Sequence, residues 1–259
     1  MIYRNPWKIQ KAVILALFLR ELNMRFSSGQ TGLFWTFFEP FFQILIFVLI
    51  KMLFFGQSNG DIDFAVFLAL NFTAFNLFRN IVMKSINAFT ANKALFLYKQ
   101  VKPIDTIIAR TMVEIFITAI ILIIFLLLGL YFNFDIAIKD ISMVALGFLF
   151  LILFSFSFAL LLSVINSFME SVSKLIGFIF TALMFTSAVF YPINILPLEI
   201  QTMLLYNPLT HFMEMIHGSY FLRLDDSYVN YMYMWLWTFA SLYIGLWLYV
   251  KLEKRIVSS

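Results

Sequence analysis

The feature that most constrains this chain is a series of long runs in which almost every residue is apolar. A helix needs about 20 such residues to cross the roughly 30 Å hydrocarbon core of a bilayer. Because the apolar residues are continuous and do not alternate with a period of two, the runs predict membrane-spanning helices and exclude a β-barrel. We predict an all-α integral membrane protein with six transmembrane helices, at about residues 33–55, 64–83, 107–130, 141–165, 175–191 and 232–250.

The composition agrees with a membrane protein. Of the 259 residues, 63% are apolar and 12% are charged, against roughly 45–50% and 25% in soluble proteins. The chain has no cysteine, which excludes disulfides, thiolate catalysis and cysteine metal sites. It also lacks a phosphate-binding P-loop, a nucleophile elbow and an HExxH zinc motif. We therefore expect one transmembrane domain over residues 1–259, with no catalytic residues, no metal site and no cofactor of its own.

The distribution of charge predicts the orientation in the membrane. Of the 18 Lys and Arg residues, all but Lys51, Lys139 and Arg223 fall on one side of the predicted spans. Because segments rich in Lys and Arg stay in the cytoplasm, both termini are expected to be cytoplasmic. The net charge of +4 then reflects topology and does not indicate nucleic-acid binding.

Residues 7–27 are too polar to span and too apolar to remain in water. Apolar side chains recur at intervals of three and four residues, at Leu15, Phe18, Leu22 and Phe26. This spacing predicts an amphipathic helix in the cytoplasmic interface. It is either a plain membrane anchor or a gate for a lipid-attached substrate, whose phosphate would meet Arg20 and Arg25.

The loop after the second predicted span contains a short helix-forming piece, residues 91–101, with aromatic and cationic side chains. Exposed aromatic residues on a cytoplasmic loop favour docking into a groove of a partner protein. The residues expected to make that contact are Asn92, Lys93, Leu95, Phe96, Tyr98 and Lys99. Further along, Arg110 and Glu114 lie four apart on one helix, where they can pair with each other.

Glu39 and Pro40 lie within the first predicted span, where a charge is costly and proline disturbs the helix. Glu39 is expected either to hydrogen-bond a neighbouring helix or to line the entry to a path through the protein. Aromatic residues cluster beside it and near the end of the fifth predicted span. They contact lipid or line that path, and the candidates for the path are Trp35, Phe38, Phe42, Phe190 and Tyr191.

Residues 192–222 contain three prolines and two apolar pieces that are each too short to cross. A broken helical hairpin that re-enters the outer leaflet fits this pattern, because such backbone is tolerated only beside protein or a cavity. Asn207 followed by Pro208 marks a helix start. His211, Glu214 and His217 follow at spacings of three, which spread them over about 120° of the helix and favour hydrogen bonding over metal binding.

Several of these motifs together resemble the permease family of type-2 ABC exporters. Within it, the chain is similar over essentially its whole length to KpsM-like inner-membrane subunits that export capsular polysaccharide. The motifs that carry the resemblance are Ala16 to Glu21 with Arg25-Phe26, Trp35 to Pro40, Val101 to Arg110, and Asn207-Pro-Leu with His211 and Glu214.

The resemblance implies a homodimer in the bacterial inner membrane with two copies of a KpsT-like ATPase subunit, which bind ATP and Mg²⁺. Residues 91–101 would be the coupling helix that docks on that subunit. The hairpin, with Asn207, His211 and Glu214, would lie near the exit for a lipid-linked polysaccharide. A periplasmic co-polymerase or adaptor and an outer-membrane export protein are implied as further partners.

Other interpretations remain open. The substrate could be O-antigen, teichoic acid or another envelope polymer, because parts of the pattern are shared by those exporters. A membrane transferase for lipid-linked sugars would need Arg110 with Glu114, or His211 with Glu214, as its reactive pair. A passive channel is weaker, because the spans show no repeated ring of polar residues. The chain departs from the family pattern at His217, where relatives commonly carry Arg, and between Phe26 and Trp35, where a common Tyr is absent.

Overall fold

A computed structural model gives the fold and describes residues 6–26, 30–55, 63–134, 136 and 138–258. Every regular element in these ranges is a helix. Five helices are long and apolar enough to cross a membrane, over Phe34–Lys51, Phe64–Ser85, Pro103–Tyr131, Ile141–Asn166 and Tyr231–Val257. The predicted all-helical, multi-pass architecture is confirmed at this level.

Along the chain, groups of long helices are separated by groups of shorter elements. The long helices are α1 (Pro6–Phe26), α2 (Gln30–Phe55), α3 (Phe64–Ser85), α5 (Pro103–Tyr131), α6 (Ile141–Asn166), α7 (Ser171–Thr186) and α10 (Tyr231–Ser258). The short ones are α4 (Ala88–Ala91), η1 (Lys93–Leu97), η2 (Ile193–Ile195), α8 (Leu198–Leu204) and α9 (Pro208–Tyr220). Asp63 and Asp140 cap α3 and α6, because each carboxylate accepts hydrogen bonds from backbone N–H groups of the first turn.

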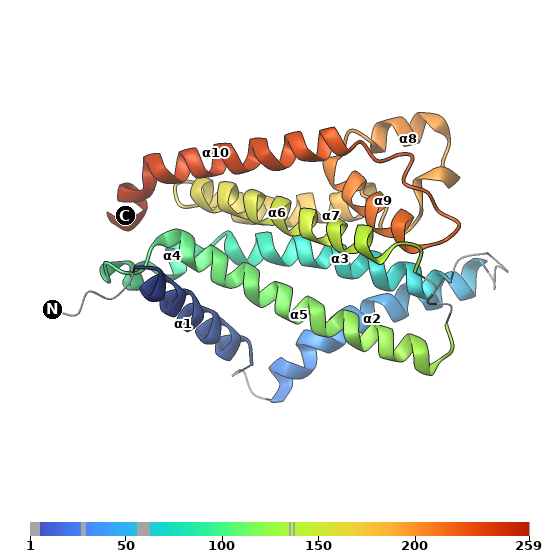
Figure 1. Cartoon of the computed structure of the whole chain (residues 1–259), viewed down its shortest axis with the longest axis horizontal. Helices are drawn as coiled ribbons and strands as arrows, with labels where there is room; N and C mark the ends of the chain where they lie inside the picture. The colour runs from blue at the N-terminus through green and yellow to red at the C-terminus, as the bar shows by residue number, and fades with distance from the viewer. Residues whose placement is uncertain (1–5, 27–29, 56–62, 135, 137, 259) are drawn as a thin grey trace.

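Helix α3 forms the centre of the molecule (Figure 1) and contacts α2, α5, α6, α7 and α9. Its sequence is rich in phenylalanine, and Phe67, Phe72, Phe75 and Phe78 are all buried. A helix that is apolar on most sides is stable only when it is surrounded. The other long helices therefore pack around α3, and α10 packs against α6 on one side of it.

The fifth predicted span, residues 175–191, falls on α7, which covers Ser171–Thr186. Its 16 residues would reach about 24 Å, which is short of the hydrocarbon core. After Ser187, the backbone of Ala188 has a φ of 56°, which a continuing right-handed helix does not allow. Helix α7 thus ends five residues before the predicted boundary, and the count of six spans stays a prediction.

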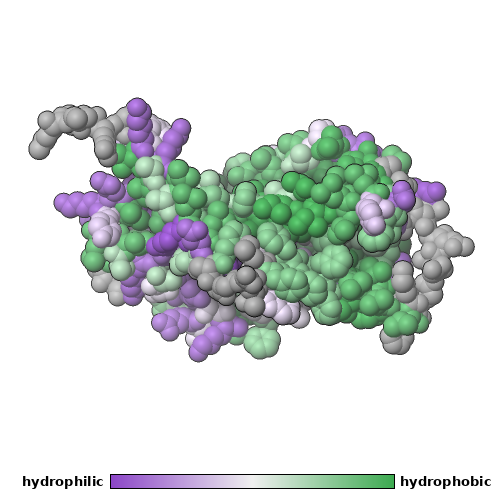
Figure 2. Space-filling model, turned by 90° about the horizontal axis from the view of Figure 1, so that it is seen from below, coloured by the Kyte–Doolittle hydropathy of each residue, from purple (hydrophilic) through white to green (hydrophobic). Residues whose placement is uncertain are grey.

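The start of α1 and the end of α10 lie at the same end of the helix bundle, together with α4 (Figure 1). We call this the terminal end, and the opposite end, which carries α8 and α9, the far end. Hydrophilic side chains gather at the terminal end, and hydrophobic ones cover the middle of the face shown in Figure 2. This distribution matches a molecule whose middle lies in hydrocarbon and whose ends meet water.

Candidate functional site

Helix α1 is attached to α5 at the terminal end by two ion pairs. Arg25 pairs with Glu114, whose side chain is 1% exposed, and Arg110 Nε lies 3.3 Å from Glu21 Oε1. Phe18 and Leu22 of α1 pack against a small buried cluster on α5, formed by Val113, Ile117 and Ile121. A helix therefore covers Pro6–Phe26, where the sequence predicts an amphipathic one, and two of its apolar side chains face protein.

The pairing expected between Arg110 and Glu114 is replaced by pairing across helices. Both side chains project from α5 toward α1, and α1 supplies the opposite charge to each, through Glu21 and Arg25. Arg110 also donates a hydrogen bond to the carbonyl of Lys84 on α3. A transferase that used Arg110 and Glu114 as its reactive pair has no support from this arrangement.

Arg20 connects α1 to the loop between α3 and α5. Its Nη2 donates a 2.5 Å hydrogen bond to Asn92 Oδ1 and lies 3.1 Å from Glu21 Oε1. Asn92 is buried, and its Nδ2 donates a 2.8 Å hydrogen bond to the carbonyl of Ala88. The side chain of Asn92 thus links the loop to α1, a role that no local sequence signal indicated.

The predicted docking segment, residues 91–101, begins at the end of α4 and contains η1 and the turn after it, and its side chains divide between the core and the surface. Phe96 is only 6% exposed and belongs to the main core, and Leu95 is half-buried against it. Tyr98 is 67% exposed, and Lys93 and Lys99 are also exposed. Leu97, which the sequence prediction did not include, is 83% exposed. The outward face of the loop therefore consists of Leu97 and Tyr98 between lysines.

The base of this loop is held by α6. Asn166 Nδ2 donates hydrogen bonds to Asn87 Oδ1 at 2.9 Å and to the carbonyl of Ile86 at 3.2 Å. Asn166 Oδ1 accepts a 3.0 Å hydrogen bond from the backbone N–H of Ser173 at the start of α7. A displacement of the loop would therefore be transmitted to α6 and α7 through Asn166.

The aromatic residues proposed for a path lie in two separate places. Trp35, Phe38 and Phe42 lie on α2, where Phe38 stacks with Phe34 and Phe42 at centroid distances of 4.6 and 5.5 Å. Trp35 and Phe42 are exposed, as is Glu39. The side chains of Trp35, Glu39 and Phe42 therefore face away from the core of the single chain.

The other two aromatic candidates lie after α7. Phe190 packs inward, with its ring 4.8 Å from that of Phe47 and 5.3 Å from that of Phe72. Tyr191 donates a 2.6 Å hydrogen bond to the carbonyl of Phe185. The structure does not bring Phe190 and Tyr191 together with the aromatic residues of α2 that were predicted to share their path.

At the far end, Asn207 and His211 fix the start of α9. Asn207 Oδ1 accepts the N–H of Leu209 at 3.0 Å, and its Nδ2 donates to Ser187 Oγ at 2.8 Å. His211 Nε2 lies 2.9 Å from the carbonyl of Leu205, and its Nδ1 accepts the N–H of Asn230 at 3.2 Å. Both ring nitrogens therefore have backbone partners, and burial lowers the pKa of His211.

Glu214 and His217 form a buried polar cluster with α3. Glu214 Oε1 accepts the N–H of Ile193 at 2.9 Å and lies 3.0 Å from His217 Nε2. His217 Nδ1 lies 3.1 Å from Asn71 Oδ1. This cluster joins α9, η2 and α3, and His211 and Glu214 do not pair as an acid–base couple. In the part of the chain that the structure describes, no group of three or more potential ligands converges as a metal site would.

Comparison with known proteins places this architecture in a family. Residues 12–221 match the model of the ABC-2 type transporter, a range that runs from α1 through α9. The chain belongs to the ABC-2 type transporter family. The match contains the ion-paired helix α1, the loop of α4 and η1, and the buried cluster at the far end.

Individual members of the ABC-2 family extend the similarity to the whole chain. The polysialic acid transport protein KpsM of Escherichia coli is 32% identical over 99% of both chains. The capsule polysaccharide export inner-membrane protein CtrC of Neisseria meningitidis is 27% identical over 96% of this chain and 94% of its own. BexB of Haemophilus influenzae, with the same description, is 24% identical over 88% and 85%. These relatives and the five candidate spans identify a multi-pass inner-membrane protein.

Proposed function

We propose that this chain is the permease subunit of an ATP-driven exporter that moves a lipid-linked capsular polysaccharide across the bacterial inner membrane. The observation that carries the proposal is the 32% identity to KpsM over 99% of both chains. Similarity to CtrC and BexB, which also serve capsule export, supports the same substrate class. Export of O-antigen, teichoic acid or another envelope polymer is the alternative within this family.

The energy for transport is supplied by a separate ATPase subunit that binds ATP and Mg²⁺. Leu97 and Tyr98 offer it an exposed apolar and aromatic surface, flanked by the cations of Lys93 and Lys99. Apolar side chains within a ring of charge are typical of a protein interface. Two copies of the permease and two of a KpsT-like ATPase would form the complex, with both termini and the loop in the cytoplasm.

Movement of the ATPase reaches the permease through the same loop. Phe96 transmits displacement to the core, and Asn92 transmits it to α1 through Arg20. Asn166 carries it to α6 and α7. Helices that move as rigid bodies about such contacts can open and close a path between two permeases.

The path itself is formed in the homodimer. Helix α7 and the residues that follow it up to Tyr191 complete six spans, and residues 192–222 form the re-entrant hairpin at the periplasmic exit, with Asn207, His211 and Glu214 holding its shape. Trp35 and Phe42, which are exposed in one chain, and Phe38, which stacks with Phe42, provide aromatic surfaces over which sugar rings slide. Arg20, Arg25 and Glu39 lie on the entry side. A periplasmic adaptor and an outer-membrane export protein continue the route.

The proposal is tested by deleting the gene in its native host and restoring it with wild-type or variant copies. We expect the deletion to leave polysaccharide inside the cell and the wild-type copy to restore it to the surface, as measured by anti-capsule staining of intact and permeabilised cells. Normal surface polysaccharide in the deletion strain would contradict the proposal. Loss of a different surface polymer would favour the alternative substrate.

A further inference from the structure

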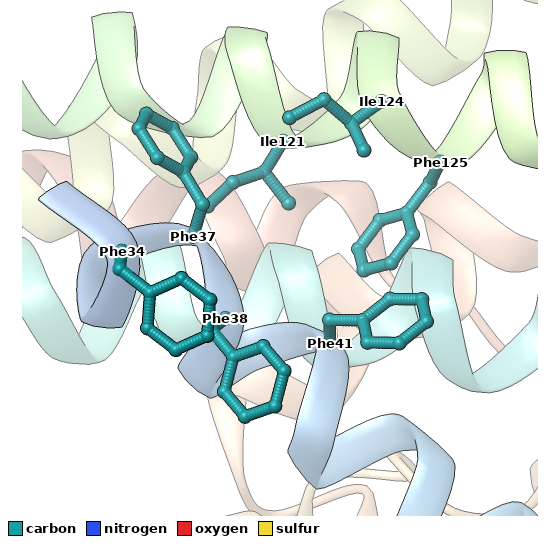
Figure 3. A pocket seen from close by; sticks show the side chains of 7 residues that line it. All are labelled: Phe34, Phe37, Phe38, Phe41, Ile121, Ile124 and Phe125. Carbon is teal, nitrogen blue, oxygen red and sulfur yellow. The ribbon is translucent and has the colours of Figure 1, made fainter.

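Two apolar cavities lie side by side between α2 and α5. The first has a volume of about 430 Å³ and is lined by Phe34, Phe37, Phe38, Phe41, Ile121, Ile124 and Phe125 (Figure 3). The second has a volume of about 540 Å³ and continues toward the far end, where residues of α3, α6 and the connection after α5 also line it. Phe41 and Phe125 belong to both cavities and stack with their ring centroids 6.5 Å apart. We call the two cavities together the α2–α5 trough.

The apolar lining of the α2–α5 trough determines which class of molecule it can bind. No charged side chain lines either cavity in the described part of the chain, and Tyr220 contributes the single side-chain hydroxyl. A sugar or a column of water would leave its polar groups without partners there. The walls belong to helices long and apolar enough to span the membrane, so the surrounding solvent is hydrocarbon.

The length of the trough suits an acyl chain. The second cavity extends from Leu122 to Phe132 on α5, which is about 15 Å at 1.5 Å per residue. An extended hydrocarbon chain can lie along this length.

A cation lies at the far-end mouth of the trough. Val48 lines the second cavity, and Lys51 is three residues later on the same face of α2. Lys51 Nζ lies 3.7 Å from the ring centroid of Phe64, next to the lining residues Ala65 and Val66. Asp63 acts on Lys51 electrostatically, and its Oδ1 accepts the N–H groups of Ala65 and Val66, which holds the carboxylate at the start of α3.

We propose that the α2–α5 trough binds one phospholipid from the leaflet at the far end, with an acyl chain in the trough and the phosphate at Lys51. An apolar trough that ends near one cation matches the chemistry of such a lipid. The proposal depends on membrane insertion alone and does not require that the protein exports capsule.

The test uses the full chain in nanodiscs of phosphatidylcholine that contain a small fraction of phosphatidylglycerol with a photoreactive diazirine on its acyl chain. After irradiation, mass spectrometry locates the labelled residues. We expect label to concentrate on Leu122 and Leu126, relative to Leu236 and Phe239, which are exposed on α10. We expect K51E to lower labelling in the trough about fivefold, because one lysine contributes roughly 1 kcal/mol toward an anionic lipid.

Filling the trough gives an independent test. The variant A69F/A145F places two phenyl rings on its walls and should abolish labelling, whereas A240F on the exposed face of α10 and K251E, a lysine beside Trp247, should not. Labelling spread evenly over α5 and α10, or unchanged in both K51E and A69F/A145F, would overturn the proposal. Displacement by lipid-linked polymer but not by excess phosphatidylglycerol would also overturn it, because the occupant would then be the anchor of the polymer.

Discussion

Glu114 shows how single residues hold α1 in place. Its carboxylate is buried on α5 and its charge is balanced by Arg25, which is separated from it by 89 positions in the chain. A buried ion pair contributes little compared with apolar packing, but breaking it by removing one partner is strongly destabilising. The pair therefore fixes which face of α1 meets α5.

Replacing Arg25 with alanine should remove the ion-pair partner of the buried Glu114, which keeps only the weaker influence of Lys84 and Asn80. We expect R25A to lower the free energy of unfolding by about 3 kcal/mol, measured by thermal or denaturant unfolding in detergent. The matched control K8A, an exposed lysine on the same helix, should change it by less than about 0.5 kcal/mol. The double variant R25A/E114Q should recover part of the loss. Equal stability of R25A and K8A would show that the pair is not structural.

Glu214 allows a second test at the residue scale. Replacing it with alanine removes the acceptor of the Ile193 N–H and the carboxylate that lies 3.0 Å from His217 Nε2. A buried donor left without a partner costs about 1–3 kcal/mol, so E214A should lower the melting temperature, whereas E199A at an exposed position should not. An unchanged melting temperature in E214A would mean that water or rearrangement satisfies the Ile193 N–H.

At the scale of elements, the loop of α4 and η1 has one face that packs in the core and another that we propose for docking. Phe96 faces the core and Leu97 faces outward, although they are adjacent. A substitution that tests docking must therefore avoid Phe96, because truncating a buried phenylalanine costs about 3–5 kcal/mol.

The variants L97E and Y98E should place a charge at the proposed ATPase contact without disturbing the core. We expect both to retain the wild-type melting temperature and to lose most capsule export, measured by surface staining. F96A should lose stability as well as export. Normal export by L97E/Y98E would show that the ATPase docks elsewhere.

The elements themselves could be predicted from sequence, but their contacts could not. Apolar runs located α2, α3, α5, α6 and α10, because a membrane span is specified by length and hydrophobicity alone. The partner of Arg110 could not be found locally, because the neighbouring charge at Glu114 competes with the distant Glu21. Which of Phe96 and Leu97 is buried could not be predicted either, because a five-residue 3₁₀ helix is too short to show periodicity.

At the scale of the whole molecule, one chain buries α2 less than any other candidate span. Only 6% of the apolar window of α2 is buried, against 67% for α3. Part of this surface borders the α2–α5 trough, and the part with Trp35 and Phe42 faces away from the chain. A second copy that covered this surface would place the two sets of aromatic residues opposite each other.

The natural absence of cysteine makes the dimer directly testable. A single cysteine in F42C should form a disulfide between two copies in membranes on mild oxidation, seen as a band of twice the mass on non-reducing gels. A matched cysteine in W247C, at an exposed position on α10, should not cross-link. Efficient cross-linking of W247C in place of F42C would show that the dimer interface lies on α10 and not on α2.

In the proposed function, transport is coupled to ATP hydrolysis on a separate subunit. We would test this coupling by measuring ATP hydrolysis in lipid nanodiscs that hold this chain, the ATPase subunit or both, with and without purified lipid-linked capsule polymer. We expect the polymer to stimulate hydrolysis only when both subunits are present, and L97E/Y98E to abolish that stimulation. Chemical turnover of the polymer by this chain alone would contradict a coupled exporter. So would a rate of ATP hydrolysis by the joint complex that does not change when the polymer is added.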